Sequence, residues 1–153
     1  MVARSRWLPP EDQLLPRDEF KRLVFLRAGG KCVFCDQPAV DAHHILERKL
    51  YPITGGYFLG NGAAVCDEHH WKCETTELTV EEVREAAGIK APVLPDGFDP
   101  AARFDKWGNI VLEDGMREAG PLAKDDGMRR ALTQGRFIGL LLPLTSKNKC
   151  FAP

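Results

Sequence analysis

Apolar positions recur at helical spacing near the start of the chain and at strand-like spacing shortly after it. Phe20, Leu23 and Val24 give residues 18–28 an apolar side, and Gly29-Gly30 follows as a stop signal. This pattern predicts a helix over 18–28. Two short apolar segments, 39–46 and 63–65, are typical of strands.

Helix signals resume after the second short apolar segment. A helix is expected to begin near Cys66 or Asp67. A further helix is predicted over Val80 to Ala87, because Thr79 and Glu82 have the spacing of a capping box and Gly88 follows as a stop. Beyond residue 91 proline and glycine predict a loop-rich segment, with one short helix over 128–134. Together these elements predict an α+β fold.

The composition is that of a globular protein of modest size. The 153 residues are 44% hydrophobic and 28% charged. Lys and Arg number 21 against 22 Asp and Glu, a net charge of −1. This balance argues against a protein that binds nucleic acid through a basic tail. A local basic patch remains compatible with it.

No membrane or secretory signal is recognised in the sequence. A membrane span needs about 20 apolar residues, whereas the longest apolar run near the end, 137–142, stops at Pro143. No apolar segment follows the basic residues Arg4 and Arg6. We therefore expect a cytoplasmic protein with no membrane partner. The oligomeric state stays open.

Cysteine and histidine spacing predicts a structural Zn²⁺ site. Cys32 and Cys35 form a C-x-x-C pair, and Cys66 and His69 form a C-x-x-H pair one helical turn apart. Thiolates and imidazoles are the usual donors of a four-coordinate zinc. The alternative is a set of buried thiols with a surface histidine. Cys73 is a rival fourth ligand, but its poor spacing from Cys66 favours a core thiol.

Three histidines remain beside this predicted zinc site, namely His43, His44 and His70. The order C-x-x-C, histidine pair, Asn61, C-x-x-H and His70 resembles the HNH endonuclease family over residues 31–76. The segments that carry the resemblance are "DAHHI" at 41–45, "NGAAVC" at 61–66 and "CDEHH" at 66–70. The chain departs from the family at His69, which stands where the family has a second cysteine.

The resemblance implies a small ββα-metal core, also called a His-Me finger, with flanking helices and a loop-rich C-terminal extension. The expected organisation is a single domain over 1–153. Within it, residues 1–30 form an N-terminal extension and helix, 31–76 the HNH core, and 77–153 a C-terminal helix and extension.

The resemblance also implies hydrolysis of phosphodiester bonds in nucleic acid, with DNA favoured over RNA. His44 would be the general base, and Asn61 would orient its imidazole by side chain or backbone carbonyl. His43 and His70 would bind one divalent cation, Mg²⁺ or Mn²⁺. The ordinary imidazole pKa of about 6.5 suits a base that works near neutral pH.

Several further residues are open to two interpretations. Glu74 follows His70 by one helical turn and is either a third cation ligand or a solvated glutamate. Arg48 and Lys49 follow the histidine pair and either contact substrate phosphate or carry ordinary surface charge. Asp41 either supports the cation site or pairs with those two basic residues. The segment "FDKWGN" at 104–109 has no assigned chemistry beyond a turn.

The competing interpretation is a non-catalytic zinc module that binds nucleic acid or protein. In that case His43 and His44 would be structural or alternative zinc ligands. A zinc site needs four ligands, whereas residues 31–76 offer at least seven cysteines and histidines together with Asn61. This surplus favours the endonuclease.

Overall fold

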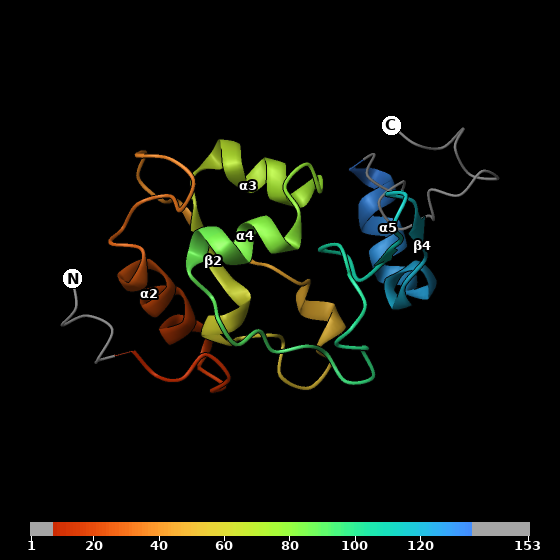
Figure 1. Ribbon diagram of the computed structural model, residues 1–153, viewed down its shortest axis with the longest axis horizontal. Coiled ribbons are helices and arrows are strands. Elements are labelled where there is room, and N and C mark those ends of the chain that lie inside the picture. The colour runs from red at the N-terminus through yellow and green to blue at the C-terminus, as the bar shows by residue number, and fades with distance from the viewer. Residues whose placement is uncertain (1–7, 136–153) are drawn as a thin grey trace.

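The structure is a computed structural model and describes residues 8–135. That part is a small mixed α+β fold with four α-helices and two antiparallel two-stranded sheets (Figure 1). The helices are α2 (Arg17–Arg27), α3 (Asp67–Glu74), α4 (Val80–Ala87) and α5 (Asp126–Gln134). The strands are β1 (Asp41–His44), β2 (Gly62–Val65), β3 (Ile110–Val111) and β4 (Arg117–Glu118). Short 3₁₀ helices are η1 (Arg48–Leu50), η2 (Leu59–Asn61) and η3 (Pro121–Lys124).

Parts of the two predicted extensions lie outside the described residues. These are residues 1–7 and 136–153, which include the apolar run 137–142 and Cys150. Within residues 8–135, no helix has the length and apolar character needed to cross a bilayer.

Strands β1 and β2 form an antiparallel hairpin, and residues 45–61 connect them. Asp41 pairs with Val65 at one end of the ladder, and His44 pairs with Gly62 at the other. The first strand is shorter than the predicted segment 39–46, although the backbone N–H of Ile45 still donates to the carbonyl of Asn61 at the loop end of the hairpin.

The β1–β2 hairpin is covered on both faces. Ala42 and Ala64 pack with Phe20 and other apolar residues of α2, whereas Ala63 and Val65 belong to the larger core that includes residues of α3 and α4. Side chains of successive strand residues point to opposite faces. The same alternation therefore directs His43 and His44 to different sides of β1.

Gly62 allows α2 to lie directly on β2. A Cβ at this position would come within 2.6 Å of Val24 and 2.7 Å of Phe20, closer than real Cβ atoms approach other side chains. The absence of a side chain at residue 62 thus brings the aromatic ring of Phe20 under the end of β1.

The caps of α4 confirm the sequence prediction. The Thr79 hydroxyl accepts from the backbone N–H of Glu82 at 3.1 Å, and the Glu82 carboxylate accepts from the backbone N–H of Thr79 at 3.2 Å. Gly88 ends the helix with a φ of 74°, in the left-handed region that favours glycine.

The C-terminal segment packs on the same core as the hairpin. Trp107, Leu122, Met128 and Leu132 are buried in the cluster that also holds Cys32 and Cys66. Helix α5 begins two residues before the predicted 128–134. The β3–β4 hairpin was not predicted, since strands of two residues are too short to show a period.

Candidate active site and metal centre

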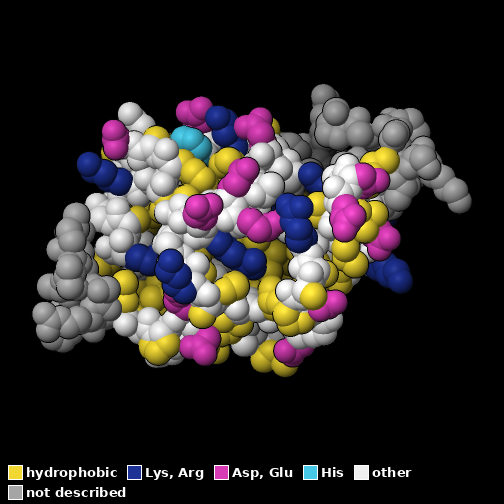
Figure 2. Space-filling model, in the orientation of Figure 1, with side chains coloured by type: hydrophobic (Ala, Val, Ile, Leu, Met, Phe, Trp, Pro, Cys, Tyr) yellow, Lys and Arg dark blue, Asp and Glu magenta, His cyan; other side chains and the backbone are white. Residues whose placement is uncertain are grey.

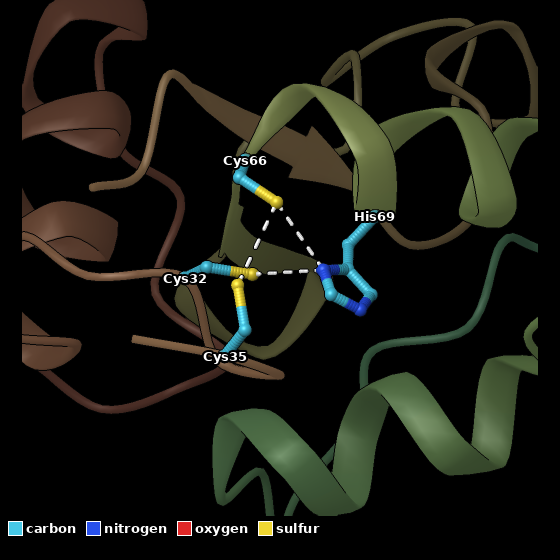
Figure 3. A group of neighbouring side chains, drawn as sticks. All are labelled: Cys32, Cys35, Cys66 and His69. Atoms are coloured by element: carbon cyan, nitrogen blue, oxygen red, sulfur yellow. Dashed lines mark hydrogen bonds between the residues drawn. The ribbon is translucent and has the colours of Figure 1, made fainter. Parts of the chain in front are cut away.

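Three cysteines and one histidine converge between the 31–37 knuckle and the start of α3. The donor atoms of Cys32, Cys35, Cys66 and His69 all lie within 4.8 Å of one another, and Figure 3 shows the four side chains pointing inward. The Cys35 and Cys66 sulfurs are 3.8 Å apart, and His69 Nδ1 lies 3.2 Å from the Cys66 sulfur.

This geometry fits a tetrahedral metal such as zinc. Thiolates about 2.3 Å from a tetrahedral zinc lie about 3.8 Å from one another. The four thiol and imidazole donors are also those that zinc prefers in structural sites. The cluster predicted from spacing is therefore present and could hold such an ion.

Backbone contacts place both halves of this cluster. The N–H of Val33 donates to the carbonyl of Ala64 on β2, and the N–H of Cys32 donates to Gln37 within the knuckle. Cys66 is the N-cap of α3, so His69 follows it within the first turn of the helix.

Cys73 lies outside this cluster, as the sequence interpretation favoured. Its side chain is 1% exposed and belongs to the hydrophobic core. Burial raises the pKa of its thiol to about 12, which keeps it protonated.

A second group of donors joins β1 to α3. His43, His70 and Glu74 each offer one ligand atom, and these atoms lie within 4.8 Å of one another. Glu74 Oε1 is 3.0 Å from His70 Nε2 and 3.6 Å from His43 Nδ1. Such a group could hold a metal ion. The fold thus brings Glu74 to His43 and His70, which favours the first of its two interpretations over a solvated glutamate.

Electrostatics favour a neutral His43 and an ionised Glu74 in this group. Burial lowers the pKa of His43 to about 4, with Lys106 adding to the effect, so its imidazole is neutral near pH 7. Burial alone would raise the pKa of Glu74. Contacts with His43 and His70 and the charge of Lys106 outweigh it and hold that carboxyl pKa well below its ordinary range. The hydrogen bond to Glu74 raises the pKa of His70.

His44 lies on the other side of β1, stacked against aromatic residues. Its ring centroid is 4.7 Å from that of Phe20 on α2 and 5.0 Å from that of Tyr57. Its Nε2 is buried and has no hydrogen-bond partner among the described residues. An unpaired buried nitrogen costs free energy unless water or another group supplies the hydrogen bond.

The pKa of His44 differs from the ordinary imidazole value assumed from the sequence. Burial, together with the positive charges of Lys106 and Arg48, lowers it to about 3. The imidazole is therefore neutral near pH 7, as a general base must be. It is also a weaker base than the ordinary value suggests.

Asn61 holds the backbone that follows His44 rather than the imidazole itself. Its Oδ1 accepts from the N–H of Leu46 at 2.9 Å, and its Nδ2 donates to the carbonyls of Leu46 and Gly56. Its own carbonyl accepts from the N–H of Ile45. Asn61 thus holds the backbone of Ile45 and Leu46, directly after β1, in place.

Both sides of β1 contribute to one surface cleft, which has a volume of about 650 Å³. His43, His44, His70 and Glu74 line it. We refer to this space as the histidine cleft.

Basic residues line the same cleft, though not both of those predicted. Arg48 is part of its wall and donates a hydrogen bond to the Tyr57 hydroxyl at 3.2 Å. Lys49 lies outside the lining and pairs with Asp125 at 3.6 Å, because η1 turns it away. Arg17, Lys21 and Arg22, from the first two turns of α2, add to the basic wall, and Arg22 is paired with Glu19.

The face in Figure 2 carries basic, acidic and hydrophobic side chains side by side. This mixture agrees with the near-neutral composition.

Sequence reasoning missed Lys106, which also lines the histidine cleft. Its side chain is 4% exposed, and its ammonium lies 3.0 Å from the carbonyl of His44. The only available signal was a lysine inside the unassigned "FDKWGN" segment, between residues that are otherwise typical of a packed turn.

The chain matches no protein-family model, no curated protein and no solved structure. The resemblance to the HNH family therefore rests on the sequence segments at 41–45, 61–66 and 66–70 alone.

Proposed function

We propose that this protein is a metal-dependent endonuclease of the HNH class that hydrolyses phosphodiester bonds in nucleic acid, DNA in preference to RNA. One observation carries the proposal. A three-donor group, His43, His70 and Glu74, and a separate neutral imidazole, His44, lie on opposite sides of one short strand and line the same cleft.

The donors of the three-residue group suit a divalent cation. Two imidazoles and one carboxylate combine the nitrogen donors that transition metals accept with the oxygen donor that Mg²⁺ and Mn²⁺ prefer. This mixture favours Mn²⁺ over Mg²⁺. When bound, the cation would supply stabilisation of negative charge on the phosphate and on the leaving oxygen.

His44 takes the role of general base in this proposal. It accepts a proton from the attacking water, whose oxygen forms a new bond to phosphorus. The bond to the 3′ oxygen breaks, and that oxygen leaves with the electron pair and takes a proton from solvent. Phe20 and Tyr57 pack against the ring and limit its rotation. Glu74, His43 and His70 stay on the opposite side of β1, so the two tasks fall to different residues.

The test is nicking of supercoiled plasmid by purified wild-type protein with Mg²⁺ or Mn²⁺ added. We expect nicking with both ions, faster with Mn²⁺, and none without an added divalent ion. Lys90→Met, a change at an exposed lysine outside the histidine cleft, is the matched preparation control. Absence of nicking of DNA and of RNA under either metal would instead favour the non-catalytic zinc module.

The basic wall of the histidine cleft leads to a prediction about substrate binding. Arg17 and Lys21 are one helical turn apart on α2, and neither forms an ion pair with another described residue. Removal of one phosphate-binding side chain should reduce the slope of log K against log salt by about 1. The double variant Arg17→Ala, Lys21→Ala should therefore reduce the slope by about 2.

Binding to a labelled DNA duplex, measured by fluorescence anisotropy in Ca²⁺ over a range of salt concentrations, checks this expectation. Lys90→Ala serves as the control for removal of a surface charge away from the cleft, and it should leave the slope unchanged. An equal decrease of the slope in both proteins would show that α2 makes no specific phosphate contacts.

A further inference from the structure

The turn at 105–109 is distant in sequence from β1 and α3 but contacts the backbone next to both of them beside the histidine cleft. The carbonyl of Lys106 accepts from the backbone N–H of Glu47, just after β1. The indole N–H of Trp107 donates to the carbonyl of Glu74, at the end of α3. One turn thus contacts the backbone beside the proposed base and the backbone of a proposed cation ligand.

The Lys106 side chain makes a second set of contacts inside the cleft. Its ammonium donates to the carbonyl of His44 at 3.0 Å and to Glu47 Oε2 at 3.1 Å, and it lies 3.7 Å from Glu74 Oε2. The ring of Trp107 packs beneath it, with 4.9 Å from the nitrogen to the ring centroid. The ammonium is therefore surrounded by partners from β1, from the loop after it and from α3.

The local sequence makes this turn rigid. Asp105 Oδ1 accepts from the backbone N–H groups of Trp107 and Asn109, and Asp105 Oδ2 accepts from Arg117. Gly108 has a φ of 80°, which the turn requires and which glycine adopts without strain. Lys106 is thus presented from a fixed backbone, which is what a residue that positions others needs.

Burial of this lysine requires an explanation beyond packing. Lysine is almost never fully buried unless it is paired, because removing an ammonium from water is costly. An apolar residue could fill the same volume without that cost. The contacts to His44 and Glu74 indicate what the charge achieves here.

We propose that Lys106 is a positioning residue that fixes the backbone of His44 and the carboxylate of Glu74 relative to each other. The effect of Lys106 on catalysis rests on the proposed function. Its effect on the positions of His44 and Glu74 does not depend on that function. The contact to the His44 carbonyl is shorter than the one to Glu74, so the principal effect is expected on the base.

The first test uses Lys106→Met, which keeps the length of the side chain and removes its charge. Groups that orient metal ligands typically contribute about 10–100-fold to metal affinity or activity, and we take the same scale for a residue that orients the proposed base. We expect kcat for nicking to fall by that factor while KM changes less than about threefold. In a His44→Ala background the same change should cost less than about twofold, because the residue through which it acts is gone. Equal decreases in both backgrounds would overturn the proposal.

A second variant separates positioning from stability. Lys106→Met leaves Glu47 without its buried partner, and adding Glu47→Gln removes that unpaired charge. The double variant should regain the thermal stability of the wild type without regaining kcat. Recovery of both would show that Lys106 only balances Glu47. Lys90→Met is the control for removal of an exposed lysine.

A spectroscopic test does not depend on activity. In ¹H–¹⁵N spectra, the His44 ring signals and the Ile45 amide should shift in Lys106→Met, with the Cys32 and Cys35 amides unchanged. If the wild-type protein fails to nick plasmid but these signals shift in Lys106→Met, the endonuclease proposal is contradicted and the positioning role is supported. Unshifted His44 and Ile45 signals would sink the positioning role, whatever the activity.

Discussion

Replacement of His44 by alanine is expected to lower the rate of phosphodiester cleavage by about 10²–10⁴-fold, the contribution typical of a general base. The ring lies apart from the His43, His70 and Glu74 group and packs on Phe20 and Tyr57. Its removal should therefore leave Mn²⁺ affinity and DNA affinity nearly unchanged. Plasmid nicking gives the rate, and calorimetric titration gives the Mn²⁺ affinity.

His43→Ala is the matched variant, since it changes the neighbouring histidine on the opposite face of the same strand. His43 is 2% exposed, and its Nδ1 is buried beside Glu74 without a hydrogen-bond partner among the described residues. Its removal should weaken Mn²⁺ binding, and excess Mn²⁺ should restore part of the rate. Excess Mn²⁺ should not raise the nicking rate of His44→Ala. A His44→Ala protein that nicks at the wild-type rate would remove the base assignment.

Removal of metal from the Cys32, Cys35, Cys66 and His69 site is expected to unfold the 31–76 region. Structural zinc sites of this kind contribute about 10–16 kcal/mol in small peptides, because the metal binds only the folded arrangement of its donors. Here the site joins the knuckle to the first turn of α3. Purified protein should contain about one tightly held zinc per chain, and a strong chelator should abolish the near-ultraviolet circular dichroism signal.

Two cysteine variants separate ligation from packing. Cys66→Ala removes a donor and should abolish zinc retention together with cooperative unfolding. Cys73→Ala removes a core thiol, so the protein should still retain zinc. Its free energy of unfolding should fall by about 1 kcal/mol, the usual size for a small core truncation. Metal analysis that finds no zinc in a folded wild-type protein would be decisive against the structural zinc.

Local rules were sufficient for several parts of the structure. The capping box of Thr79 and Glu82 and the stop at Gly88 depend only on residues a few positions apart. The chelating pairs also depend on short spacings, and the structure joins them into one cluster. Strand alternation explains why His43 and His44 lie on opposite sides of β1, and of the two interpretations of Glu74 the structure favours the one that places it beside His70.

Some details of the site depended on the environment rather than on residue type. The ordinary imidazole pKa did not apply to His44, because Phe20 and Tyr57 bury its ring and Lys106 adds positive charge. Asn61 was expected to orient that ring, whereas its side chain bonds to the backbone of Leu46 and Gly56. Both outcomes follow from contacts that spacing does not encode.

The sequence by itself determined the elements around β1 and the four zinc-type donors, because these follow from short-range spacing. His43 and His70 came from the resemblance to a family, and the sequence left the role of Glu74 open. Only the tertiary structure decided which charged side chains lie beside these residues. Lys106 reaches His44 across 62 positions, α2 brings Arg17 and Lys21 to the cleft wall, and η1 turns Lys49 away toward Asp125. The physical reason is that such contacts depend on how distant segments pack, and no local period or propensity specifies that packing.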